Sequence, residues 1–289
     1  MSVGQAQRQK GTSYREVEKP GAIPQLLTLT GQDISQRVRG MLIWGSILGA
    51  LGALFVAVWP SFSEDTAGME QMVSSMPPAM RELFGFGEGA FSSVEGFIGG
   101  EMLNFLVPLA LAFFPILVAS SVLAGAEEEG KIDVLMGNPL SRWQLVLGRF
   151  LSAAVLLLGI VTIMGLITWF TGLIVDVDLA FESMAAASLS LWALCIFFGG
   201  LALLLSAVFH RRFLALMVPA SLLIVMYFVN GLAGSVEFFE TIQPLSAFNY
   251  YGSAIEDGLD WGNFAVLTGS TVVLVGLAVL IFRRRDIYA

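Results

Sequence analysis

The sequence predicts an all-α integral membrane protein with six transmembrane helices, both termini in the cytoplasm and a short cytoplasmic helix between spans two and three. Three observations predict this fold class. Of the 289 residues, 56% are hydrophobic and only 13% are charged, whereas soluble domains carry about 25% charged residues. Six apolar runs are long enough to cross a bilayer, and the basic residues fall almost entirely on alternate segments between them.

Each predicted span is an apolar run of at least about 19 residues, which at about 1.5 Å per residue covers roughly 28 Å, close to the thickness of the hydrocarbon core. No run has a charged residue near its centre. The predicted spans are residues 41–59, 102–125, 150–175, 185–209, 213–233 and 264–282.

The basic residues predict the orientation. The chain has 15 Lys and Arg residues, and all but one lie before span one, between spans two and three, between spans four and five, or after span six. The exception is Arg81, in the first external connection. Because basic residues are retained on the cytoplasmic side, both termini are expected inside a multi-pass protein of the plasma (inner) membrane. The net charge of −8 comes largely from the external connections, so it says nothing about a nucleic-acid partner, and none is expected.

Three regions are predicted along the chain. Residues 1–22 read as a disordered polar tail, and residues 41–289 as one six-helix membrane domain. Residues 23–40 could form an interfacial helix along the inner leaflet, with Arg37 and Arg39 near anionic headgroups, or could be a simple charged flank.

Two of the external connections carry helix signals. In the first, "MPPAMRELFGFG" predicts a short helix that begins after the prolines and is stopped by Gly85. The fifth connection mixes aromatic and acidic residues, and could dip into the outer leaflet as short helices.

The stretch "GAEEEGKI", residues 125–132, has the G-x-x-x-x-G-K spacing of a nucleotide-binding P-loop. A P-loop continues with Ser or Thr after the Lys, and it follows a buried strand. Here Ile132 follows the Lys, a predicted membrane helix precedes the motif, and three glutamates inside it would repel a triphosphate. We therefore expect no ATP binding by this chain.

The same stretch predicts a structural element instead. Residues 131–136 suit a short helix with Ile132, Leu135 and Met136 on one face, and Pro139 breaks it before "LSRWQLVLGRF" starts span three. An exposed apolar face on a stiff cytoplasmic loop indicates a docking surface. The alternative is that these side chains pack on the ends of the spans.

The residues offer no catalytic or metal site. With one His and one Cys, neither a zinc site nor a Cys–His nucleophile pair can be assembled. No ionisable residue lies near the middle of a span, which argues against a carrier driven by protons or sodium ions. Energy for transport would have to come from outside the chain.

At this point the sequence resembles a known family. The acidic triplet, the Gly, the short apolar stretch and "NPLSR" before a new span are similar to the signature of type-2 ABC exporter permeases. The likeness extends over nearly the whole chain, through "RVRGMLIW", "WPSF", "MPPAMRELFG", "QPLSAFNYYGSAIEDG" and "FRRRDIY". In that family the loop between spans two and three carries the coupling helix, which docks into a groove of a separate ATPase subunit.

The resemblance implies roles for the residues of this loop. The acidic triplet would face basic residues of the ATPase, Gly130 would provide the turn, two apolar side chains would fill the groove, and Pro139 and Arg142 would fix the return. Arg142 could equally contact lipid headgroups. The implied docking residues are Glu127, Glu128, Glu129, Gly130, Ile132, Leu135, Pro139 and Arg142.

The resemblance also implies a substrate path. Members work as two permeases, identical or paralogous, with two ATPase subunits that bind ATP and Mg²⁺, and spans two and five line the path between the permeases. Aromatic and Met side chains there suit amphipathic or apolar cargo, although ordinary helix packing explains each position equally well. The candidates are Asn104, Phe113, Phe114, Met226, Tyr227 and Asn230.

The sequence thus predicts the permease subunit of an ABC exporter, which is not itself an enzyme and holds no cofactor of its own. The alternative is a membrane scaffold or assembly factor that uses residues 127–142 to recruit a cytoplasmic protein and transports nothing.

Overall fold

The computed structural model describes residues 22–63, 66–84, 86, 91–128 and 141–284. These residues are almost entirely helical, and no strand occurs among them. Six of the helices are long and apolar enough to cross a membrane, which confirms the predicted number of spans. The six are α1 (Ala22–Ser63), the composite helix Val94–Gly125, α8 (Arg142–Val175), α9 (Phe181–Val208), α10 (Arg212–Gly231) and α13 (Trp261–Arg284).

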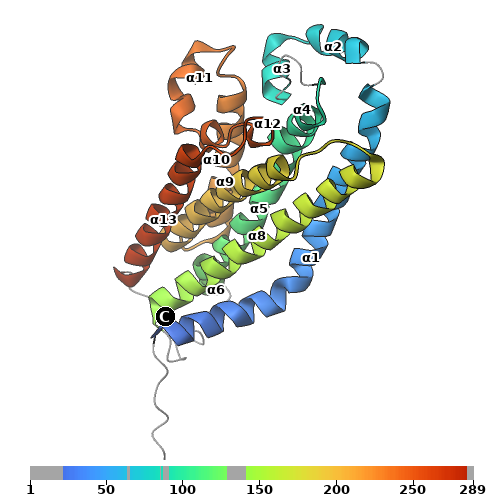
Figure 1. Ribbon diagram of the computed structural model, residues 1–289. Helices are drawn as coiled ribbons and strands as arrows, with labels where there is room; N and C mark the ends of the chain where they lie inside the picture. The colour runs from blue at the N-terminus through green and yellow to red at the C-terminus, as the bar shows by residue number, and fades with distance from the viewer. Residues whose placement is uncertain (1–21, 64–65, 85, 87–90, 129–140, 285–289) are drawn as a thin grey trace, which may run out of the picture.

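The first span differs from the prediction in its length. Residues 23–40 and 41–59 lie in one continuous helix, α1, and Gly31 does not interrupt it. Figure 1 shows that the beginning of α1 runs across the end of the bundle before the helix bends and continues along it. A single glycine costs a helix only about 1 kcal/mol, and the packing of α1 along α8 outweighs that cost.

The second span is not a regular α-helix. It consists of α4 (Val94–Ile98), the π-helix η1 (Gly99–Leu106), α5 (Val107–Ser120) and the π-helix η2 (Ser121–Gly125), followed by α6 (Ala126–Glu128). Neighbouring elements bond to both π-helices: the Tyr251 hydroxyl donates to the Leu103 carbonyl (2.9 Å), and the Ala124 N–H donates to Ser206 Oγ of α9 (3.0 Å). π-helical turns often mark functional positions.

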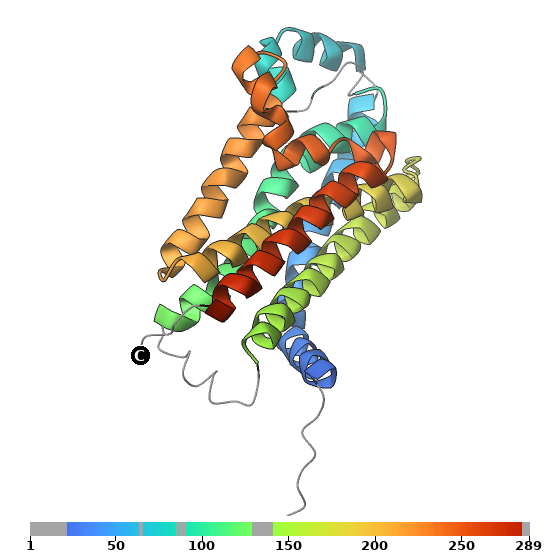
Figure 2. The ribbon, with the colours of Figure 1, turned by 90° about the vertical axis from the view of Figure 1, so that its left-hand side faces the viewer.

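The bundle is built around α9, which packs against α5, α8, α10 and α13 (Figures 1 and 2). Small residues allow close approach within it; for example, a Cβ added at Gly199 would lie 2.8 Å from Cβ of Pro115. The helices α1, α10 and α13 lie at the periphery and expose long apolar faces, as expected where a span faces lipid or another subunit.

The most extensive pairing among the described helices is that of α1 with α8, and glycines of α1 allow the two backbones to approach closely. Gly45 and Gly49 form a G-x-x-x-G pair, and a Cβ at either would lie 2.8 Å from the Cβ of an isoleucine of α8. A Cβ at Gly52 would collide with Oγ1 of Thr168. Small residues at this spacing are how membrane helices bring their backbones together.

We therefore expect Gly52→Val to separate α1 from α8 and to destabilise the bundle by about 1–3 kcal/mol, because an overpacked interface must shift to admit the side chain. Gly276→Val is the matched control, since Gly276 of α13 is exposed and nothing lies within 4 Å of its missing Cβ. Thermal unfolding of the purified chain should show a lower Tm for the first variant only. Equal Tm values for both variants would contradict the close packing.

The short helices gather at one end of the bundle, which we call the cap end. They are α2 (Thr66–Ser74), α3 (Pro78–Phe84), α11 (Glu237–Ile242) and α12 (Ala254–Asp257), with the 3₁₀ turns η3 (Gln243–Leu245) and η4 (Ala247–Tyr250). The helix predicted after the prolines is α3, which ends at Phe84. The start of α1, the end of α13 and α6 lie at the opposite end, the terminal end (Figures 1 and 2).

Candidate functional site

A cavity of about 490 Å³ lies at the cap end between α3, η1 and α10. We call it the α3–α10 cavity. Its wall combines charged, amide, hydroxyl and aromatic side chains from segments that are far apart in the sequence. The lining residues are Arg81, Glu82, Leu83, Phe86, Asn104, Tyr227, Asn230, Gly231, Gly234, Phe248, Tyr251, Gly252 and Ser253.

Hydrogen bonds fix the elements that surround the cavity. The Tyr227 hydroxyl of α10 donates to the backbone carbonyl of Leu83, which holds α3 against α10. The Ser235 hydroxyl donates to Glu82 Oε2 (2.9 Å). Tyr227 also packs on the ring of Phe248, with ring centroids 5.5 Å apart. Specific hydrogen bonds and ring packing therefore hold the elements that form the cavity in place.

The structure brings three of the predicted substrate-path residues, Asn104, Tyr227 and Asn230, to the wall of this cavity. The other three do not line it. Phe113 and Phe114 of α5 and Met226 of α10 are half-buried and pack against the hydrophobic core. A role in transport stays a prediction for all six. Sequence reasoning did not select Arg81 for the cavity, although its position as the lone basic residue of the connections predicted to be external was a usable signal.

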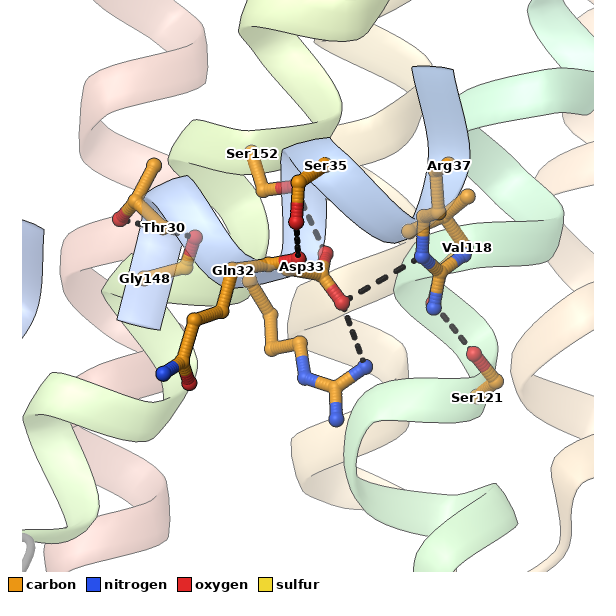
Figure 3. Close-up of polar contacts among 10 residues, drawn as sticks. Thr30, Gln32, Asp33, Ser35, Arg37, Val118, Ser121, Gly148 and Ser152 are labelled. Carbon is orange, nitrogen blue, oxygen red and sulfur yellow. Dashed lines mark hydrogen bonds and ion pairs between the residues drawn. The ribbon is translucent and has the colours of Figure 1, made fainter. Parts of the chain in front are cut away.

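A polar cluster at the terminal end ties α1 to α8. Asp33 of α1 is buried, with 9% of its surface exposed. Its Oδ1 accepts hydrogen bonds from Arg37 Nε (3.3 Å) and Arg149 Nη1 (3.0 Å), and its Oδ2 accepts from the Ser152 hydroxyl (2.7 Å). We call Asp33, Arg37, Arg149 and Ser152 the Asp33 cluster. Figure 3 shows that Arg37 also points toward Ser121, the first residue of η2.

Further bonds extend this attachment along the beginning of α1. Gln144 of α8 donates to Gln25 (3.3 Å), and the Thr30 hydroxyl lies 3.4 Å from the Gly148 carbonyl (Figure 3). Ser141 and Gln144 form the capping box that starts α8. The beginning of α1 is thus fastened to the part of α8 that immediately follows residues 129–140.

Comparison with known proteins decides the family. Residues 27–287 match the family model described as "ABC-2 family transporter protein". The chain belongs to the ABC-2 transporter family. This match covers nearly the whole chain and confirms the resemblance to type-2 ABC permeases that the loop and flanking motifs indicate. No match was found among curated proteins.

An ABC-2 protein is the membrane component of a transporter, and such permeases generally work with an ABC ATPase. The six apolar helices agree with a multi-pass membrane subunit. Among the described residues, the α3–α10 cavity at the cap end and the Asp33 cluster at the terminal end are therefore two polar sites with a possible part in transport.

Most of the predicted docking residues of this ABC-2 protein lie outside the described residues, namely Glu129, Gly130, Ile132, Leu135 and Pro139. The others flank that segment. Glu127 and Glu128 form part of α6, where Glu128 is exposed, and Arg142 is the first residue of α8. The end of α6 and the start of α8 both lie at the terminal end, where the start of α1 also lies (Figure 1).

Proposed function

We propose that this ABC-2 protein is the permease subunit of an ABC exporter, which moves an amphipathic or apolar substrate out of the cytoplasm with ATP hydrolysed by a separate subunit. The family match over residues 27–287 is the observation that carries this proposal. The partner ATPase, present in two copies, would bind ATP and Mg²⁺. It would dock on the permease at the loop that α6 and α8 flank.

The distribution of charge supports an orientation for the exporter. Both ends of the described chain lie at the terminal end (Figures 1 and 2). The basic residues of the Asp33 cluster, the pair that begins α10 and the pair that ends α13 lie there too. By the positive-inside rule, the terminal end would face the cytoplasm and the cap end the exterior.

The exposed face of α10 supports a second permease copy or a paralogue as partner. Large apolar side chains on α10 are strongly exposed in the single chain, among them Phe213 (66%), Val225 (53%) and Phe228 (43%). On α5 and η1, Leu117 and Leu106 are also exposed. If two copies meet along these faces, the α3–α10 cavity lies beside the path between them.

The terminal end suggests how movement would pass from the ATPase to the spans. A docked ATPase would push on the segment between α6 and α8. Because the Asp33 cluster fastens the beginning of α1 to α8, that push would move α1 and α8 together. Span two, which lies between the cap end and α6, contains two π-helical turns, a feature that is frequent at functional sites.

ATP hydrolysis by the membrane complex tests this function. With the complex in lipid nanodiscs, we expect hydrolysis to rise several-fold when an amphipathic cargo is added, because transport and hydrolysis are coupled. A scaffold that recruits a cytoplasmic protein would show no stimulation by any cargo. Inhibition of cargo-stimulated hydrolysis by orthovanadate serves as the control for ATPase-dependent turnover.

A further inference from the structure

Arg81 lines the α3–α10 cavity, and the contacts of its guanidinium with described residues do not account for its half-buried position. Its Nε is buried and has no hydrogen-bond partner, and within the described part of the chain its guanidinium forms no ion pair. A buried cationic donor without a partner is costly. The position favours an anionic group that the described residues do not supply.

The neighbouring carboxylate does not fill this role. Glu82 accepts the hydrogen bond of Ser235, and it lies against Gly234, where an added Cβ would be 2.8 Å from Glu82 Oε1. Its carboxylate is thus directed to the segment after α10. Glu82 is also exposed to solvent, so its charge is screened.

The other residues of the cavity wall indicate what else the ligand would contain besides an anionic group. The amide of Asn104 faces the same cavity and has no hydrogen-bond partner among the described residues, so it can donate to an oxyanion. Phe86, Tyr227 and Phe248 give the cavity aromatic surface. A cation and an amide beside aromatic rings match one anionic group attached to an apolar body.

We propose that the α3–α10 cavity binds the anionic group of an amphiphile, with Arg81 and Asn104 as its donors and the aromatic residues against its apolar part. A guanidinium binds the planar edge of a phosphate, sulfate or carboxylate with two parallel hydrogen bonds. The ligand is the transport substrate only if the proposed exporter function holds, but binding itself does not depend on that function.

The test uses the purified full chain in maltoside detergent, titrated calorimetrically with dodecyl phosphate, dodecyltrimethylammonium and inorganic phosphate. We expect dodecyl phosphate to bind and Arg81→Gln to weaken it by about 10- to 100-fold, since a charge-assisted contact is lost. Arg81→Lys should restore only part of the affinity, because an ammonium lacks the planar fork. Arg39→Gln, which removes an exposed arginine of α1, is the matched control and should bind normally.

Three results would overturn the proposal. The first is equal binding of the cationic amphiphile, and the second is unchanged affinity in Arg81→Gln. The third is inorganic phosphate binding as tightly as dodecyl phosphate, which would make the site one for free anions. Because Arg81 forms no ion pair with another described residue, the Tm of ligand-free Arg81→Gln should match that of the wild type or exceed it, so misfolding cannot account for lost binding.

The experiments distinguish failure of the cavity assignment from failure of the proposed exporter function. An ATPase partner and cargo-stimulated hydrolysis without anion binding would refute the cavity assignment alone. Anion binding in a chain that recruits no ATPase would refute the exporter assignment and leave the site in place.

Discussion

Replacing Asp33 with Asn is expected to loosen the beginning of α1 and to uncouple ATP hydrolysis from transport. The carboxylate accepts hydrogen bonds from two arginines and a serine while buried. An amide offers one acceptor oxygen and turns two of its own donors toward guanidinium groups. Loss of hydrogen bonds to a buried charged group costs about 1–3 kcal/mol, enough to release a segment that only a few other bonds attach.

Hydrogen exchange measured by mass spectrometry reports this loosening directly. We expect faster exchange across residues 22–40 in Asp33→Asn and little change in α9. Gln32→Ala is the matched control, because Gln32 is the preceding residue on the same helix and is exposed. Unchanged exchange in Asp33→Asn, together with normal transport per ATP hydrolysed, would show that the Asp33 cluster neither fastens α1 nor passes on movement.

Replacing Glu127, Glu128 and Glu129 together with Lys is expected to detach the ATPase without unfolding the bundle. The reversal changes the charge of the predicted interface by six units, so attraction to basic residues of the partner becomes repulsion. We expect an affinity loss of at least about 100-fold, measured as ATPase recovered with the tagged permease. The Tm of the isolated permease should stay within a few degrees of the wild type.

Two controls separate docking from a general charge effect. The same three positions changed to Gln should give an intermediate loss, since attraction is removed without repulsion. Glu237→Gln with Glu240→Gln alters exposed acids at the cap end and should leave ATPase recovery unchanged. Normal recovery and normal stimulated hydrolysis in the Lys variant would refute the docking assignment.

The number and order of the spans could be predicted because the length and apolarity of a run are dictated by the bilayer. The continuity of α1 across residues 40 and 41 could not, because it depends on tertiary packing. Gly45, Gly49 and Gly52 meet α8 residues that lie more than a hundred positions away. The Asp33 cluster also depends on tertiary packing. From the sequence alone Asp33 resembles a surface acid, and only the fold brings Arg149 and Ser152 to it.

The cavity was only partly foreseen. The resemblance implies Asn104, Tyr227 and Asn230 for the substrate path, and all three line the cavity. The resemblance implies Phe113, Phe114 and Met226 in the same way, but residue type alone does not distinguish a substrate path from a hydrophobic core, and these three pack against the core. The place of Arg81 could not be predicted without the fold, because α3 is held against α10 by tertiary contacts, among them the hydrogen bond from the Tyr227 hydroxyl to the Leu83 carbonyl.

We expect this ABC-2 protein to be driven by a separate ATPase, and purification from its host membranes tests this dependence. The tagged chain would be extracted in a mild detergent, each co-purifying protein identified and its stoichiometry measured, and ATP hydrolysis assayed. We expect an ABC ATPase in equimolar amount with the permease, and ATP hydrolysis by the isolated complex. Recovery of the chain without any ATPase, or with a partner that does not hydrolyse ATP, would contradict it.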